Sequence, residues 1–241
     1  ERRLAEEKRI KELEEMYHDA TNSAKKALEK YKKSADGARS NLEAALDKLN
    51  TLYKKADVNI DVSETRTDYY KIEEILGVTY YLEGAYKLSV PLLRDAADNG
   101  SAKSRIYLTQ WLLRNRGELP SDQGFLLGYI TEAIEGDVTE EEITIANRVL
   151  AKMYRDGIGV KKSLPTAFEY FKKAADAGDI TSVATVGQCY MYGEGVKKNA
   201  KEAFEWNKRA AEAGDAAEEV AADIDTSEHV VINYMVTGDK P

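Results

Sequence analysis

The sequence has little of what disulfide-bonded, metal-binding and membrane-spanning proteins need. Its 241 residues include one cysteine, four prolines and two histidines, His18 and His229, far apart in the chain. One cysteine excludes an internal disulfide, and so few Cys and His residues exclude a zinc site built from neighbouring ligands. No stretch approaches the ~18 consecutive apolar residues of a transmembrane helix. We therefore expect a charged, helical chain with no metal site and no membrane span.

Loops that bind nucleotides are missing as well. Gly157-Ile-Gly159 and Gly193-Glu-Gly195 lack the third glycine and the preceding strand of a dinucleotide-binding fingerprint, and no Walker-type loop occurs. The sequence therefore assigns no catalytic residue and no cofactor.

The acidic excess is unevenly distributed. The net charge is −8, but residues 1–57 carry +2 and the remaining residues carry −10. Nucleic acids bind clustered lysines and arginines, which the acidic part lacks, so we expect no nucleic-acid partner. The asymmetry indicates two regions.

Residues 1–56 have the spacing of a helical hairpin or coiled coil. Apolar or small side chains recur in steps of three and four residues along two runs of this segment, as in a heptad seam. Gly37 favours a helix end, and Ser40 and Glu43 have capping-box spacing. We predict a helix, a turn near residues 36–39 and a second helix, with one continuous helix as the alternative.

The seam is rich in alanine, which buries little area, so these helices must rest on something. We expect a homo-oligomer assembled through residues 4–56, with packing against residues 64–100 as the alternative. Glu1 lies inside the first expected helix, which indicates a boundary within a longer protein. The expected chain is soluble, and periplasmic or secreted if an N-terminal signal or anchor has been removed.

Internal repetition is the strongest signal in the sequence. Residues 149–178 match residues 185–214 at a constant offset of 36, with no gap. The matched positions include a Gly-x-Gly loop, aromatic residues and close-packing alanines, namely Tyr154/Tyr190, Gly157/Gly193, Gly159/Gly195, Ala174/Ala210 and Gly178/Gly214. Neither helix of such a unit can bury its apolar face alone, so the units must stack.

The unit resembles the Sel1-like repeat, a relative of the tetratricopeptide repeat with a longer loop between its helices. The residues that carry the resemblance form two copies of one motif, Ala151-x-x-Tyr154-x-x-Gly157-x-Gly159-Val160 and Gly187-x-x-Tyr190-x-x-Gly193-x-Gly195-Val196. One departure is Asn207, where the first copy has Phe171, and we expect the next unit to pack differently at this site.

Fainter units upstream extend the array, so we predict an all-α solenoid of about four stacked antiparallel helix pairs over residues 64–224. A connector over residues 57–63 joins it to the N-terminal helices. Residues 225–241 are expected to form a capping helix or, alternatively, an extended tail. An insertion at residues 137–142 reads as a loop in which the acidic residues are solvated.

The repeat register also predicts burial. Tyr154, Tyr170, Tyr190 and Trp206 should be mostly buried between helices. Cys189 occupies the slot that Met153 fills one repeat earlier, so we predict a buried, inert thiol.

The resemblance implies a non-enzymatic scaffold or adaptor that binds a protein or peptide partner through the solenoid surface. The alternative is an envelope-tethered structural or assembly protein with the N-terminal helices as a stalk, and a remote alternative is a hydrolytic enzyme of the Sel1-like class. In the tetratricopeptide-like register, variable positions of the first helix of each pair form the inner face. These candidate partner-binding residues are Lys71, Glu74, Val78, Tyr81, Arg148, Lys152, Arg155, Gln188, Met191 and Tyr192.

Overall fold

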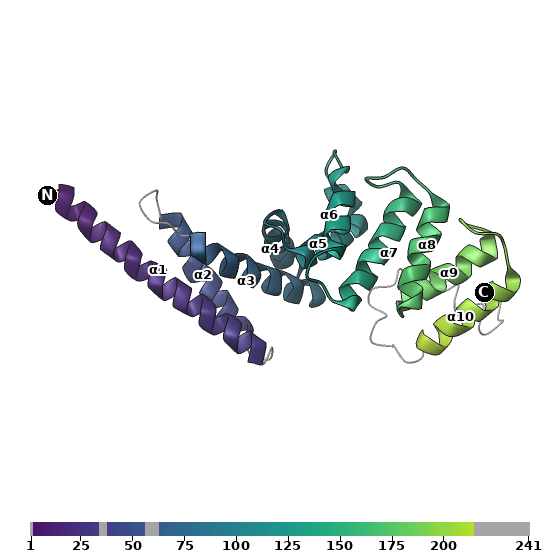
Figure 1. Ribbon diagram of the computed structural model, residues 1–241, viewed down its shortest axis with the longest axis horizontal. Helices are drawn as coiled ribbons and strands as arrows, with labels where there is room; N and C mark the ends of the chain where they lie inside the picture. The colour runs from purple at the N-terminus through teal and green to yellow at the C-terminus, as the bar shows by residue number, and fades with distance from the viewer. Residues whose placement is uncertain (1, 34–37, 56–62, 215–241) are drawn as a thin grey trace. The chain divides into compact units, whose positions relative to one another are not determined.

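The computed structural model describes residues 2–33, 38–55 and 63–214, and this part of the chain is all-α (Figure 1). It contains ten α-helices and one short 3-10 helix, and no strand occurs among these residues. The helices belong to two compact units, Glu1–Leu108 (unit 1) and Thr109–Pro241 (unit 2). The predicted all-α architecture of helix pairs is confirmed.

Unit 1 begins with the predicted hairpin and not with one continuous helix. Its helices are α1 (Arg2–Lys33), α2 (Arg39–Lys55), α3 (Ser63–Leu82), α4 (Tyr86–Asp98) and the first half of α5 (Ala102–Arg114). Helices α1 and α2 pack antiparallel, and α3 pairs with α4 in the same way (Figure 1). The predicted connector lies largely outside the described residues.

The alanine seam of α1 is covered within the chain. Ala20, Ala24 and Ala27 are buried against leucines of α2, including Leu49, and the same core continues to Ile72 in α3. Packing on the start of the repeat region therefore accounts for the seam without a second chain. Self-association through residues 4–56 stays a prediction.

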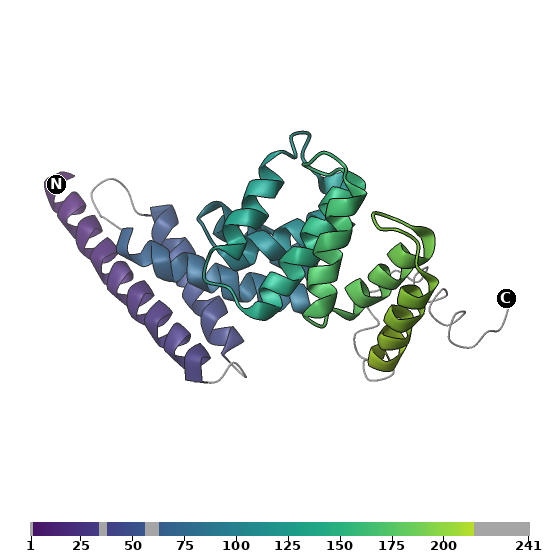
Figure 2. The same ribbon diagram turned by 45° about the vertical axis from the view of Figure 1, so that its right-hand side comes forward.

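Unit 2 holds the two clear repeats as consecutive helix pairs (Figure 2). Its helices are η1 (Arg116–Glu118), α6 (Phe125–Ile134), α7 (Glu140–Asp156), α8 (Leu164–Asp176), α9 (Ile180–Tyr192) and α10 (Ala200–Gly214). The first repeat is α7–α8 and the second is α9–α10. Residues 215–241, for which a cap or tail was predicted, lie outside the described residues.

The second glycine of each Gly-x-Gly loop permits a close backbone approach. Gly195 has φ +73°, and a Cβ added there would overlap the carbonyl group of Leu164 at the start of α8. Gly159 has φ +68° and meets the carbonyl group of Gln123 just before α6 in the same way. Each loop therefore packs against the start of a helix in the preceding helix pair. Only glycine, which has no Cβ, allows the two backbones to come this close.

The four aromatic residues of the register are mostly but not fully buried, as predicted. Tyr154, Tyr170, Tyr190 and Trp206 each keep a minor exposed part, and all four pack against the buried core of the repeats. Tyr154 stacks on Tyr170 with ring centroids 5.8 Å apart, and Tyr190 meets Phe168 edge-on at 5.3 Å.

The predicted loop over residues 137–142 is wrong at its C-terminal end. Residues 140–142 form the first turn of α7, whose 17 residues exceed the 13 of α9. The Thr139 backbone N–H donates to Glu142 Oε2 at 2.9 Å, and the Glu142 N–H donates to Thr139 Oγ1 at 3.3 Å. This capping box buries Glu142, so its carboxylate caps the helix and is not a solvated loop acid.

Asn207 packs against Gly187 of its own repeat, whereas the following unit, which was predicted to pack differently there, lies outside the described residues. In the first repeat, the equivalent positions hold Phe171 and Ala151, which are both buried. In the second repeat the Asn207 side chain lies so close to Gly187 that a Cβ on Gly187 would overlap it. Where the first repeat has Phe171 and Ala151, the second repeat therefore packs the polar side chain of Asn207 directly on the backbone of Gly187.

Candidate binding groove

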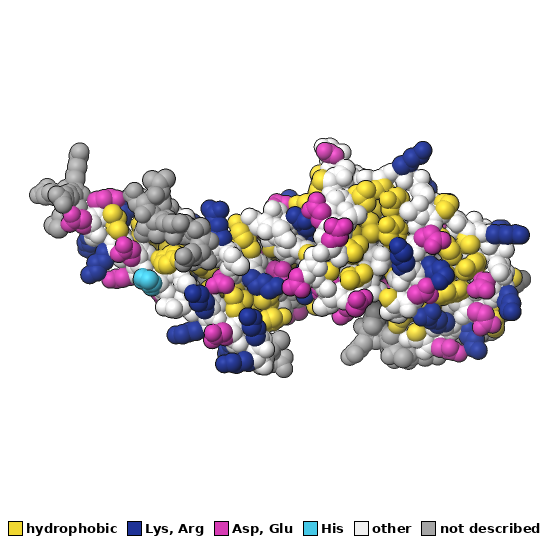
Figure 3. Space-filling view, in the orientation of Figure 1, with side chains coloured by type: hydrophobic (Ala, Val, Ile, Leu, Met, Phe, Trp, Pro, Cys, Tyr) yellow, Lys and Arg dark blue, Asp and Glu magenta, His cyan; other side chains and the backbone are white. Residues whose placement is uncertain are grey.

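Unit 1 contains a groove of about 760 Å³. Its floor is one face of α3, one wall is the last turns of α1, and the other wall is the turn between α4 and α5. In Figure 3, hydrophobic side chains lie beside lysines and arginines over α1 and α3. A hollow of this size has room for several side chains of a ligand.

An amphipathic stripe of α3 forms the floor. Lys71, Ile75, Val78 and Leu82 recur in steps of three or four residues, which places them on one face of the helix. Ile75 is buried and Val78 half-buried, whereas Leu82 is 69% exposed although it is a large apolar side chain. The floor thus offers apolar surface that the described part of unit 1 leaves open.

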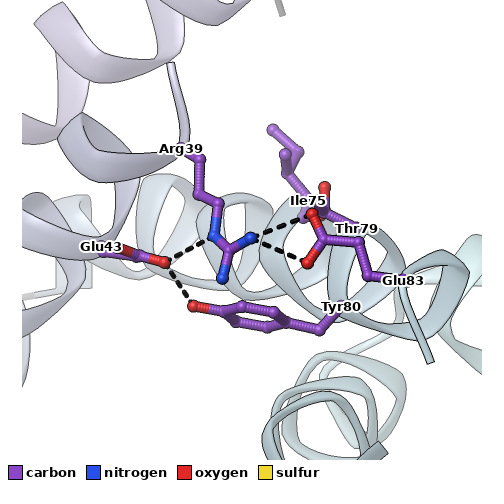
Figure 4. Close-up of polar contacts among 6 residues, drawn as sticks. All are labelled: Arg39, Glu43, Ile75, Thr79, Tyr80 and Glu83. Atoms are coloured by element: carbon purple, nitrogen blue, oxygen red, sulfur yellow. Dashed lines mark hydrogen bonds and ion pairs between the residues drawn. The ribbon is translucent and has the colours of Figure 1, made fainter. Parts of the chain in front are cut away.

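The α1 wall stays in place because its hairpin is fastened to α3 (Figure 4). Arg39, at the start of α2, donates to Glu43 Oε1 at 2.8 Å and to both carboxylate oxygens of Glu83 at 2.9 and 2.7 Å. Tyr80 donates its hydroxyl to Glu43, and its ring lies 4.6 Å beneath the guanidinium of Arg39. The hydrogen bond from Tyr80 and the contact with Arg39 lower the pKa of Glu43, so the carboxylate stays charged.

Further contacts fix the rest of the hairpin. Near the other end of α2, the hydroxyl groups of Tyr53 and Thr65 are 2.7 Å apart. Lys48 of α2 pairs with Asp19 of α1 at 3.0 Å. Helix α2 is thereby joined to α3 at both ends and to α1 at its middle, which sets the width of the groove.

The opposite wall is tied to the floor through Glu74. The Ser101 hydroxyl donates to Glu74 Oε2 at 2.8 Å, and Lys71 Nζ donates to Glu74 Oε1 at 2.6 Å. The Ser104 backbone N–H donates to Ser101 Oγ at 3.0 Å, so the same serine caps α5. Glu74 is therefore a buried acid with both oxygens bonded, and it holds the α4–α5 turn against α3.

The sequence register brings three of its four candidates in this unit to the groove. Lys71, Glu74 and Val78 line it. Tyr81 does not, because it is buried with its ring against Tyr86 at 5.4 Å and Tyr107 at 5.1 Å.

The candidates in unit 2 are dispersed, and part of their charge is used within the chain. Arg148 Nε forms an ion pair with Asp179 at 3.2 Å, and Arg155 Nε forms one with Asp156 at 3.1 Å. The remaining candidates range from half-buried to exposed, namely Lys152, Gln188, Met191 and Tyr192, the last of these 54% exposed.

Sequence reasoning missed the walls of the groove. Leu28, Tyr31 and Lys32 of α1 line one side, and the turn over residues 99–101 with Lys103 lines the other. A step of three or four residues joins Leu28 to Tyr31 and Lys32, so the helical face was visible in the sequence. Its position beside α3 depends on the contacts of Arg39 and could not be read from spacing.

A buried acid lies on another face of α3. Glu73 is 4% exposed, and its Oε2 has no hydrogen-bond partner among the described residues. Burial, together with the neighbouring carboxylate of Asp95 in α4, raises the pKa of Glu73 to about 8. The carboxyl group is therefore largely protonated at neutral pH and belongs to the packing of α3 on α4.

Features of catalytic and metal sites are scarce in the described ranges. No group of three or more His, Cys, Asp or Glu side chains there could hold a metal ion. Of the helices described, none is long and apolar enough to cross a membrane. Cys189 is 6% exposed, which confirms its predicted burial, and desolvation raises the pKa of its thiol to about 11.

Comparison with known proteins agrees with this architecture. The family model described as Sel1 repeat matches residues 144–179 and 184–215, which cover most of α7–α8 and α9–α10. No curated protein matches the sequence.

Two crystal structures are similar. A protective antigen present in uropathogenic Escherichia coli strains, displaying an SLR fold, matches with a TM-score of 0.54 at 20% identity. The match covers 84% of this chain but 41% of the antigen, so this chain spans less than half of the antigen's length. A Sel1 repeat protein from Oxalobacter formigenes matches with a TM-score of 0.43 at 25% identity, over 52% of this chain and 90% of that one.

The matched repeats coincide with the Gly-x-Gly loops and helix pairs of unit 2, and the likeness to the antigen shows the same fold. The predicted resemblance is confirmed for these repeats: the chain has an α-solenoid fold and contains two Sel1 repeats, α7–α8 and α9–α10.

Proposed function

We propose that this chain is a non-enzymatic scaffold that binds a segment of a partner protein in the groove of unit 1. Proteins with Sel1 repeats generally serve as protein-interaction scaffolds. The groove itself is the observation that carries the proposal, because its floor exposes apolar surface between two fixed walls. Contiguous exposed apolar surface with a polar rim is typical of interaction sites.

The charged groups and the shape of the groove also support binding and not catalysis. Lys71 and Glu74, two of its titratable groups, bond to each other. Helix pairs of this kind present extended concave surfaces on which partner segments lie. The groove therefore needs no chemistry of its own to select a partner by shape and charge.

A display library of random peptides, panned against the full chain, tests this function. We expect enriched peptides to bind the native chain and to lose binding to Val78→Arg, because the arginine fills the apolar floor. Leu88→Arg is the matched control, since Leu88 is 56% exposed on α4 and does not line the groove. Circular dichroism establishes that both variants are folded. Binders that are insensitive to Val78→Arg would place the interaction surface elsewhere and contradict the proposal.

A further inference from the structure

We infer that the segment bound in the groove is an acidic amphipathic helix of the partner protein. This inference rests on the proposed function and names the chemistry of its ligand. Two features of the groove carry it, the helical spacing of its apolar side chains and the sign of its charge.

The apolar surfaces that face the groove follow helical ridges. On α3 the ridge is Ile75, Val78 and Leu82, and on α1 it is Leu28 and Tyr31. Side chains spaced in this way leave grooves into which the ridges of another helix fit. An amphipathic helix with apolar residues at the same spacing can cover both ridges at once, which is a recurring mode of peptide recognition.

The charged side chains around the groove are mainly cationic. Lys32, Arg66, Lys71 and Lys103 line it, against two acids, Asp68 and Glu74. Both oxygens of Glu74 are already bonded to Lys71 and Ser101, so this acid offers little repulsion to a ligand.

Two of these cations are available for a ligand. Within the described residues, neither Lys32 nor Arg66 forms an ion pair. A cationic groove is unusual for a chain whose net charge is −8. Complementary charge steers association and selects between partners, so the ligand should carry carboxylates on its polar face.

Fluorescence anisotropy of labelled synthetic peptides with the full chain tests the inference. The first probe is a helix of about four turns with leucines in steps of three and four residues and glutamates on the opposite face. The second probe has lysines in place of the glutamates, and the third has glutamines. We expect the glutamate peptide to bind at least about tenfold more tightly than the lysine peptide, with weaker binding as salt increases.

Two substitutions link this preference to the groove. Lys32→Glu should weaken the glutamate peptide several-fold and leave the glutamine peptide nearly unchanged, whereas Val78→Arg should weaken both. Lys87→Glu is the matched control, because Lys87 is exposed on α4 outside the groove. All three variants keep buried residues intact, and circular dichroism verifies their folding.

The outcomes separate this inference from the proposed function. If glutamate and lysine peptides bind equally and both depend on Val78, the acidic preference is wrong and the scaffold function stands. If library binders depend on Val78 while no helical probe binds, the helical ligand is wrong. A synthetic peptide of this chain's residues 215–228, which is acidic, serves as a competitor. If it binds as tightly as the glutamate probe, the occupant is this acidic segment of the chain itself and the inference of a helix from a partner protein is overturned.

Discussion

Small residues and close backbone contacts join the helices of unit 2, whereas unit 1 adds to its apolar core a set of polar contacts between helices. In unit 2, Ala167, Ala175 and Ala210 share one buried core, and loop glycines rest on neighbouring backbone. In unit 1, Arg39 reaches Glu83 across 44 residues of sequence. The close backbone contacts at the loop glycines recur every 36 residues and leave no room for a side chain. The polar contacts between helices do not recur at a fixed spacing, and they depend on charge. The two units should therefore fail under different changes.

The largest effect is expected from Gly195→Ala in unit 2. Alanine in the left-handed region costs about 1–2 kcal/mol, and the overlap with the Leu164 carbonyl adds about 1–3 kcal/mol of strain. Hydrogen exchange of the α8 and α9 amides should show a loss of about 3 kcal/mol in opening free energy.

Gly84→Ala in unit 1 is the matched control for that change. Gly84 has φ +75°, close to that of Gly195, but nothing lies within 4 Å of an added Cβ. Hydrogen exchange of the α3 and α4 amides should therefore show a smaller loss of opening free energy, about 1–2 kcal/mol, which is the cost of alanine in the left-handed region alone. Equal losses for the two substitutions would show that close loop packing contributes nothing to unit 2.

The same contrast explains how much of the fold could be predicted. The offset of 36 residues predicts both repeats of unit 2 correctly. Close backbone contacts require glycine or alanine, so these residues recur at the same positions of each repeat. Residues 140–142 were misplaced although Thr139 and Glu142 have capping-box spacing, since the insertion was taken for a loop. In unit 1, Gly37 and Ser40 sufficed to predict the hairpin.

The groove could be predicted only in part for the same reason. Lys71, Glu74 and Val78 follow from the periodicity of a single helix. The α1 wall is placed by contacts such as Tyr53 with Thr65, which obey no repeat. The Glu74 hydrogen bonds that hold the other wall are equally aperiodic. Spacing therefore predicts a face, and only the structure shows what stands opposite to it.

A second effect should distinguish unit 1 by its response to pH. The pKa of Glu73 is about 8 in the folded chain against an ordinary value of 4.5, so the folded state holds the proton more tightly. Its contribution to stability is complete below about pH 4.5, falls as the pH rises, and is lost above about pH 8. The slope in this window is at most about 1.4 kcal/mol per pH unit.

Glu73→Gln should remove that slope, because the amide cannot ionise. Urea denaturation followed by circular dichroism, repeated between about pH 5 and pH 8.5, gives the free energy of unfolding at each pH. Asp47→Asn, an exposed carboxyl of α2, is the control and should leave the slope in place. An unchanged slope in Glu73→Gln would mean that the carboxyl ionises freely in the folded chain.

The smallest expected effect is the reaction of Cys189 with a thiol reagent. Cys189 lies in the apolar core of the repeats, and burial raises its pKa to about 11, so little thiolate exists near neutral pH. Labelling must then wait for local opening and should be at least about a hundredfold slower than for an exposed cysteine. The matched comparison is Tyr192→Cys in a Cys189→Ser background, because Tyr192 ends the same helix and is 54% exposed. Mass spectrometry of the intact chain measures both rates.

Gly195→Ala should accelerate labelling of Cys189 if the close backbone contact at Gly195 holds α9 in place, whereas Arg39→Ala in unit 1 should not. Rapid labelling of the native chain would show that the second repeat opens readily, and the contrast between the two units would then have to be drawn from stability alone.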